Sequence, residues 1–168
     1  MTAYRDATAD DAPAIDGLFK SVFCGTFGHL YRAEDLDAFL AQFTLEAWRT
    51  QLTDPAYAVR LAEQDGRAIG YAKLGPMKLS LDENRPSILL SQLYVNPAHH
   101  GQGVAHALTD WAFAEARRRC KERLYLTVFI DNPRARRFYE RFGFEEVGRF
   151  DFMVGKQADH DIVMRKHL

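Results

Sequence analysis

Two glycines between an apolar run and a helical pattern form the first candidate for chemistry in this sequence. The run Leu93-Tyr94-Val95 leads to Pro97, a short turn holds Gly101 and Gly103, and a long helical pattern begins at Val104. A strand, loop and helix in this order present free backbone N–H groups at the positive end of a helix. This arrangement suits a pyrophosphate, which glycines allow close to the main chain. An ordinary glycine turn before a helix has the same spacing.

A second candidate segment lies further along the chain. It reads Asn132-Pro133-x-Ala135-x-x-Phe138-Tyr139-Glu140-x-Phe142-Gly143-Phe144. Asn132 is a typical helix N-cap and Pro133 a typical first helical residue. Ala135, Phe138 and Phe142 share an apolar face, and Tyr139 lies at its rim. The Tyr139 hydroxyl can therefore project into a cleft, or the ring can be a half-buried core aromatic with its hydroxyl in water.

Together the two segments resemble the GNAT acetyltransferase superfamily. In that family the strand, loop and helix hold the pyrophosphate of acetyl-CoA through the pattern Arg/Gln-x-x-Gly-x-Gly/Ala. This sequence matches the pattern from Gly103 to Ala105 but has His100 where Arg or Gln is usual. The departure leaves the backbone site intact and leaves the role of the His100 side chain open.

The resemblance implies an acetyl-CoA site without a metal, in which Tyr139 acts as the general acid. Backbone groups of the strand would bind the pantetheine arm, and the glycine loop would bind the phosphates. Arg134, Arg136 and Arg137 are candidates for the 3′-phosphate side. The implied cofactor-binding residues are Leu93, Tyr94, Val95, His100, Gly101, Gln102, Gly103, Val104, Ala105, Asn132, Ala135, Arg137 and Phe138.

The elements that position these residues follow from hydrophobic periodicity and turn signals. Alternating or apolar runs predict strands over 4–7, 58–64, 67–74, 88–95, 124–130, 144–150 and 160–165. Helical patterns run from the caps at Thr8-Asp11 to about Phe23, over 33–42, over 45–52 after the cap Thr44, and over 104–119 and 133–142. The segment 24–29 breaks the first helix, 75–86 is a loop or hairpin tip, and the last two strands form a hairpin around Gly155-Lys156-Gln157.

This order predicts a mixed α/β or α+β fold in a single domain, 1–168. The resemblance implies a twisted, mostly antiparallel sheet of about seven strands, flanked by helices, in which the fourth and fifth strands splay apart.

Composition excludes several classes of protein. The chain has 168 residues and a formal net charge of -1, which argues against general nucleic-acid binding. Its apolar runs are too short for a bilayer span, and the N-terminus lacks the features of a signal peptide, so we expect a cytoplasmic protein that does not bind membranes. Cys24 and Cys120 lie far apart and have no metal-ligand spacing.

Charge is distributed unevenly along the chain. Residues 1–83 hold 13 acidic and 8 basic side chains, and residues 84–168 hold 10 acidic and 14 basic. A basic half suits a polyanionic cofactor and an acidic half suits a cationic acceptor, although uneven solvated surface charge would look the same. The region 27–43 and the ends 152–155 and 161–164 look similar to the bacterial branch that acetylates polyamines such as spermidine. We therefore expect a small amine acceptor, with Tyr31, Glu34, Asp35 and Asp37 as its binding residues.

No general base stands where many members of the family have a carboxylate, because Ser91-Gln92 occupies that place. Either a water chain relays the proton, or Glu34, Asp35, His29 or Glu46 accepts it. The missing carboxylate also keeps open a non-catalytic acyl-CoA sensor or interaction module. Acetylation of protein N-termini or other small amines is a further alternative, and a homodimer is left open.

Overall fold

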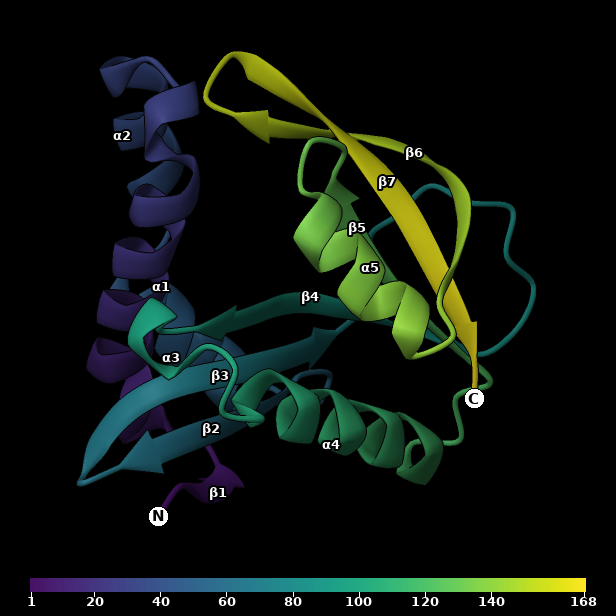
Figure 1. The fold of residues 1–168 in the computed structure, drawn as a ribbon, viewed down its shortest axis with the longest axis horizontal. Coiled ribbons are helices and arrows are strands. Elements are labelled where there is room, and N and C mark those ends of the chain that lie inside the picture. Colours follow the sequence, from purple (N-terminus) through teal and green to yellow (C-terminus); the bar gives the residue numbers. More distant parts are fainter.

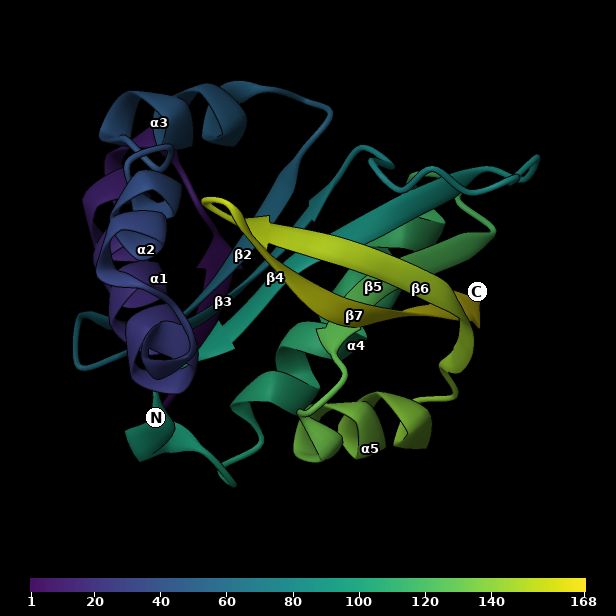
Figure 2. The same cartoon turned by 90° about the horizontal axis from the view of Figure 1, so that it is seen from above.

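The computed structural model describes residues 1–168 and contains one seven-stranded sheet with helices on both faces (Figures 1 and 2). The strands are β1 (Ala3–Asp6), β2 (Ala58–Gln64), β3 (Arg67–Gly75), β4 (Ser87–Val95), β5 (Arg123–Phe129), β6 (Glu145–Val154) and β7 (Gln157–His167). The helices are α1 (Ala12–Phe27), α2 (Ala33–Leu40), α3 (Leu45–Thr53), α4 (Val104–Arg118) and α5 (Pro133–Arg141). Short 3-10 turns lie at Ala9–Asp11, Gly28–Leu30 and Pro97–His99.

The sheet has the order β1-β2-β3-β4-β5-β7-β6, and β4 with β5 forms its one parallel pair. That pair extends only from Ser87 to Leu89 on β4 and from Arg123 to Tyr125 on β5. Beyond these residues the two strands diverge. The mixed α/β fold with a splayed central pair, expected from the sequence, is confirmed.

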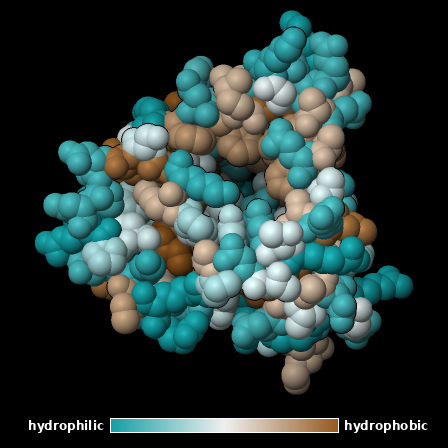
Figure 3. Space-filling model, turned by 180° about the vertical axis from the view of Figure 1, so that it is seen from behind, coloured by the Kyte–Doolittle hydropathy of each residue, from teal (hydrophilic) through white to brown (hydrophobic).

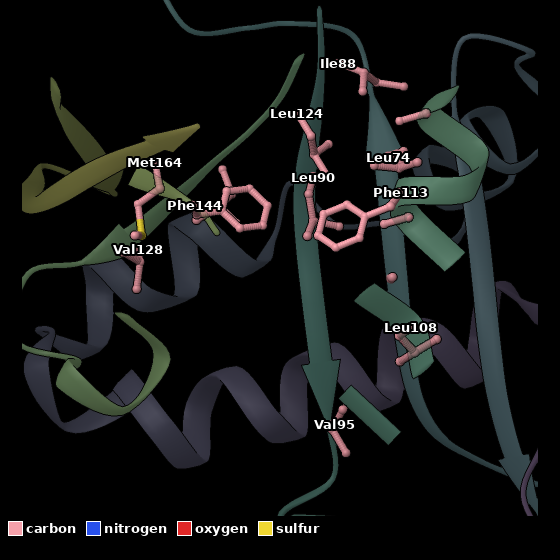
Figure 4. Packing of buried hydrophobic residues seen from close by; sticks show 14 of the residues in the cluster. Leu74, Ile88, Leu90, Val95, Leu108, Phe113, Leu124, Val128, Phe144 and Met164 are labelled. Atoms are coloured by element: carbon pink, nitrogen blue, oxygen red, sulfur yellow. The ribbon is translucent and has the colours of Figure 1, made fainter. Parts of the chain in front are cut away.

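Two main clusters of buried side chains hold the layers together. One joins the sheet to α4 and to the segment after α5, and includes Leu90, Leu108, Phe113 and Phe144 (Figure 4). The other joins the opposite face to α1, α2 and α3. Each face of the sheet therefore has its own core, and the divergence of β4 and β5 opens a passage between the two layers.

Most helix boundaries follow the caps seen in the sequence. The Thr44 hydroxyl accepts a hydrogen bond from the Ala47 N–H at 3.0 Å, and the Asn132 amide oxygen accepts one from the Ala135 N–H at 3.2 Å. Helix α1, however, continues through Gly25 to Phe27 and ends inside the predicted break at 24–29, so the predicted helix end near Phe23 is wrong. Phe27 packs on Phe23 and Phe129, and this contact outweighs the cost of about 1 kcal/mol for a glycine inside a helix.

The terminal hairpin is longer than predicted. Strands β6 and β7 continue to a two-residue turn, Gly155-Lys156, instead of ending near Phe150 and starting at His160. The tip of this hairpin lies against the α1–α2 side of the molecule (Figure 1). None of the helices is sufficiently long and apolar to cross a membrane.

Candidate active site

The divergence of β4 and β5 creates two connected cavities. The larger has a volume of about 510 Å³ and the smaller about 160 Å³. Seen from behind, the surface is hollowed near the centre of the view, with both hydrophobic and hydrophilic side chains around the opening (Figure 3). Residues at the gap between the strands line both cavities; these are Phe27, Leu93, Tyr94, Asn132, Ala135 and Tyr139.

The larger cavity is bounded by the glycine loop and the start of α4. Gly101 and Gly103 have φ values of 77° and 82°, a region that favours glycine, and a Cβ on either would meet open space. The first bond of the helix runs from the Ala107 N–H to the Gly103 carbonyl at 3.0 Å, so the N–H groups of the preceding turn have no partner within the helix. The loop therefore offers free donors at the positive end of α4.

His100 ties the loop to its neighbours. Its Nε2 lies 3.0 Å from the Val95 carbonyl, and its Nδ1 lies 3.1 Å from Nη1 of Arg134. A carbonyl only accepts and a guanidinium only donates, so the ring must carry its hydrogen on Nε2. His100 lines the larger cavity as a link between β4 and α5.

Basic side chains surround this cavity. Arg134 and Arg141 line it, together with His99 and His106. Three residues that were assigned to the cofactor from the sequence do not line it. Arg137 is exposed, Arg136 pairs with Glu140 and Glu146, and the side chain of Gln102 donates to the Ala98 carbonyl at 3.1 Å. The other predicted cofactor residues line the cavity.

Tyr139 stands where the two cavities meet. Its ring is half-buried and packs against Phe138 and Phe144. Burial raises the pKa of its hydroxyl above the ordinary value, so the group stays protonated at neutral pH. Burial is the main cause of the raised pKa of Tyr94, and Tyr139 and Asp161 raise this pKa further. The three groups therefore lie close together.

The smaller cavity is acidic. Asp159 and Asp161, on the same face of β7, are 8% and 7% exposed and both line it. The Tyr31 hydroxyl donates a hydrogen bond to Asp159. Burial, partly opposed by the Thr127 hydroxyl and reinforced by Asp159, raises the pKa of Asp161 to about 6.

Aromatic rings complete the wall of the smaller cavity, and no lysine, arginine or histidine lines it. The rings belong to Phe23, Phe27, Tyr31, Tyr94, Phe129, Tyr139 and Phe152. The two carboxylates therefore face a cavity without a cationic side chain from the chain itself.

The acidic residues predicted for the acceptor are placed differently from Asp159 and Asp161. Glu34 and Asp37 are exposed on α2 and line neither cavity. Asp35 is buried, and its Oδ1 accepts a hydrogen bond from the Lys156 N–H at 2.8 Å, so it holds the hairpin tip against α2. Of the predicted acceptor residues, Tyr31 alone lines the smaller cavity.

The base candidates named from the sequence also lie elsewhere. His29 and Glu46 line neither cavity, like Glu34 and Asp35. Asp159 and Asp161 were not predicted from the sequence, although a signal was present. Both residues share one face of the last strand with the buried Val163. Carboxylates are unusual on a buried face. The predicted strand began at His160 and left Asp159 outside.

Comparisons with known proteins agree with this arrangement. The model of the acetyltransferase (GNAT) family matches residues 21–144. An uncharacterized N-acetyltransferase of Mycobacterium tuberculosis is 38% identical over 117 residues, covering 70% of this chain and 71% of the relative.

Two solved structures share the fold. The PaiA N-acetyltransferase from Thermoplasma acidophilum in complex with coenzyme A has a TM-score of 0.80 at 16% identity, covering 100% of this chain and 99% of the other. The ribosomal-protein-S18-alanine N-acetyltransferase from Escherichia coli has a TM-score of 0.73 at 18% identity, covering 99% and 94%. The chain belongs to the acetyltransferase (GNAT) family and is an N-acetyltransferase.

Proposed function

We propose that this enzyme transfers an acetyl group from acetyl-CoA to the primary amine of a small cationic acceptor, with a polyamine as the first candidate. The observation that carries the proposal is the smaller cavity, in which Asp159 and Asp161 are buried without a cationic partner. Burying unpaired carboxylates is costly, so a site that holds two of them suits a ligand that brings positive charge.

The larger cavity fits the other substrate. Free N–H groups at the start of α4, two glycines with positive φ and a rim of Arg134 and Arg141 are the donors that a pyrophosphate and a further phosphate require. The structural neighbour from Thermoplasma acidophilum holds coenzyme A. Acetyl-CoA bound there would supply the activated acetyl group.

The size of the acceptor is limited by the hairpin tip. Asp35 binds the Lys156 N–H, Gln157 donates to the Leu30 carbonyl at 2.9 Å, and Tyr31 donates to Asp159. These three contacts join the tip of the β6–β7 hairpin to α2 and to the segment that precedes α2. Because they lie beside the acidic cavity, we propose a small acceptor in preference to an extended peptide.

Direct transfer suits the position of Tyr139. Its hydroxyl makes no hydrogen bond within the chain, lies between the two cavities and is protonated at neutral pH. We assign to it the donation of a proton to the departing thiol. Neither cysteine lines the cavities, so nothing suggests a thiol acyl-enzyme.

The test is thiol release from acetyl-CoA with a panel of acceptors at equal concentration. The panel holds spermidine, putrescine, a neutral hydroxylated amine, an N-acetylated polyamine and a peptide with an N-terminal alanine. We expect the polyamines to have the highest kcat/KM. Turnover of the peptide alone would point instead to protein N-termini, on which the E. coli neighbour is named to act. Acetyl-CoA binding without any turnover would support an acyl-CoA sensor.

A further inference from the structure

We propose that the Asp161 carboxylate takes the proton from the acceptor ammonium, while Asp159, held by Tyr31, keeps that ammonium in place. This inference rests on the proposed function, because it concerns the acceptor's amine. The inference assigns the general base, since none of the base candidates named from the sequence lines either cavity.

The need for a base follows from the acceptor's chemistry. An alkylamine with a pKa of about 10.4 is neutral in roughly 1 molecule of 2,500 at pH 7, and only the neutral form is a nucleophile. A carboxylate within reach of the ammonium can accept its proton as the nitrogen approaches the acetyl carbon.

Asp161 is the carboxylate with the right surroundings. It is 7% exposed, lines the smaller cavity and forms no ion pair with any side chain of the protein. The titratable groups that face it are Asp159 from its own strand, Tyr31 from the segment before α2, Tyr94 from β4 and Tyr139 from α5. None of them carries positive charge, so Asp161 is free to receive a proton.

Asp159 has a different role because it already has a partner. The Tyr31 hydroxyl donates to its carboxylate, and the pKa of Tyr31 is raised, first by burial and then by this bond. With Tyr31 bound to it, Asp159 serves to hold the ammonium. Asp161, whose pKa is raised to about 6 chiefly by burial, is the better proton acceptor.

The protons of the reaction balance on this assignment. The acceptor nitrogen loses its first proton to Asp161, and its lone pair forms the C–N bond as the C–S bond breaks. Tyr139 donates its proton to the departing sulfur and recovers one from the second N–H of the nitrogen. Asp161 then releases the first proton to solvent, so the net products are the amide, the free thiol and one proton.

The test compares Asp161→Asn, Asp159→Asn and wild type with spermidine and with 2,2,2-trifluoroethylamine, which is mostly neutral at pH 7. For Asp161→Asn we expect kcat with spermidine to fall about 10²-fold or more, and the fall of wild-type kcat below about pH 6 to disappear. With trifluoroethylamine the same variant should stay within about threefold of wild type. Asp159→Asn should mainly raise KM for spermidine and should keep the fall of kcat below about pH 6. The control is Asp151→Asn, an exposed β6 carboxylate that lines neither cavity.

Two results would overturn the assignment: an Asp161→Asn enzyme with wild-type kcat for spermidine and an unchanged fall of kcat below about pH 6, or an equal loss with both amines. The proposed function is tested separately, with the wild-type enzyme alone. If wild type turns over only a peptide, the same comparison is made with that peptide, whose terminal amine also has to lose a proton. If no amine is turned over, both proposals are wrong.

Discussion

At the scale of single residues, the Tyr139 hydroxyl can be tested by itself, because it lies where the two cavities meet. Removing its hydroxyl in Tyr139→Phe should lower kcat about 10²- to 10⁴-fold, the usual contribution of a general acid, and leave the affinity for CoA nearly unchanged. Steady-state kinetics and calorimetry measure the two quantities. Tyr57→Phe removes a hydroxyl from a ring that packs near Gly75, away from both cavities, and should have wild-type kcat. Full activity in Tyr139→Phe would remove this residue from the mechanism.

Gly103 tests the loop at the start of α4. In Gly103→Asp a carboxylate enters the place assigned to the phosphates, so CoA affinity should fall by several kcal/mol. Gly66→Asp is a matched control, because Gly66 also has a positive φ, 72°, and open space around a Cβ, but lies in the β2–β3 turn. The control should lose similar stability and bind CoA as wild type does. Equal affinities in the two folded variants, measured by calorimetry, would argue against this phosphate site.

Asp161 also affects stability in a pH-dependent way. Its pKa is about 6 in the folded protein, above the ordinary value of 3.8, so the folded state holds this proton more tightly than the unfolded chain. Stability therefore falls as pH rises from about 4 to about 6, by up to roughly 3 kcal/mol. Asp161→Asn removes the penalty. Its Tm should exceed that of wild type by several degrees at pH 7.5 and equal it near pH 4. A Tm difference that does not change with pH would contradict this titration.

At the scale of elements, the β6–β7 hairpin supplies Phe152, Asp159 and Asp161 to the acidic cavity, and α2 holds the tip of that hairpin. Gly155 lies so close to α2 that a Cβ on it would come within 2.6 Å of the Asp35 Cα, and Asp35 accepts the neighbouring Lys156 N–H. Asp35 is thus a structural contact between two elements far apart in the sequence. Its carboxylate has no part in the lining of either cavity.

Asp35→Ala should loosen this hairpin tip. The Lys156 N–H loses its acceptor, which costs about 1 to 3 kcal/mol, and hydrogen exchange at that amide should speed up. We also expect KM for small amines to rise, because the wall of their site moves. Asp37→Ala, an exposed change on the same helix, is the control and should leave exchange and KM unaltered. If Asp37→Ala raised KM as much as Asp35→Ala, the α2 surface itself would bind the acceptor.

The elements were largely predictable from the sequence because they depend on local signals. The caps Thr44 and Asn132, the glycine loop and the alternating strands all act within a few residues. The end of α1 and the length of the terminal hairpin could not be predicted, because they depend on contacts of Phe27 with Phe129 in β5 and of Asp35 with Lys156 in the β6–β7 turn. The acidic cavity was missed for the same reason, because Asp159 and Asp161 come together with Tyr31 only when the start of β7 lies beside the segment between α1 and α2.

At the scale of the whole molecule, the two cavities have opposite charge and meet at one gap in the sheet. Arg134 and Arg141 line one, and Asp159 and Asp161 line the other. Both substrates can therefore be bound together, and initial-rate lines for acetyl-CoA and amine should intersect when plotted in double-reciprocal form. Parallel lines would indicate a covalent acyl-enzyme and would contradict direct transfer.

The absence of a cationic side chain from the smaller cavity has a consequence for the end of the catalytic cycle. In the proposed reaction acetylation converts an ammonium into a neutral amide, so the reacting end of the product no longer carries the charge that Asp159 and Asp161 attract. The same two buried carboxylates that favour entry of the amine then favour departure of the amide. Product release would thus be driven by the chemistry itself, without any movement of the hairpin tip.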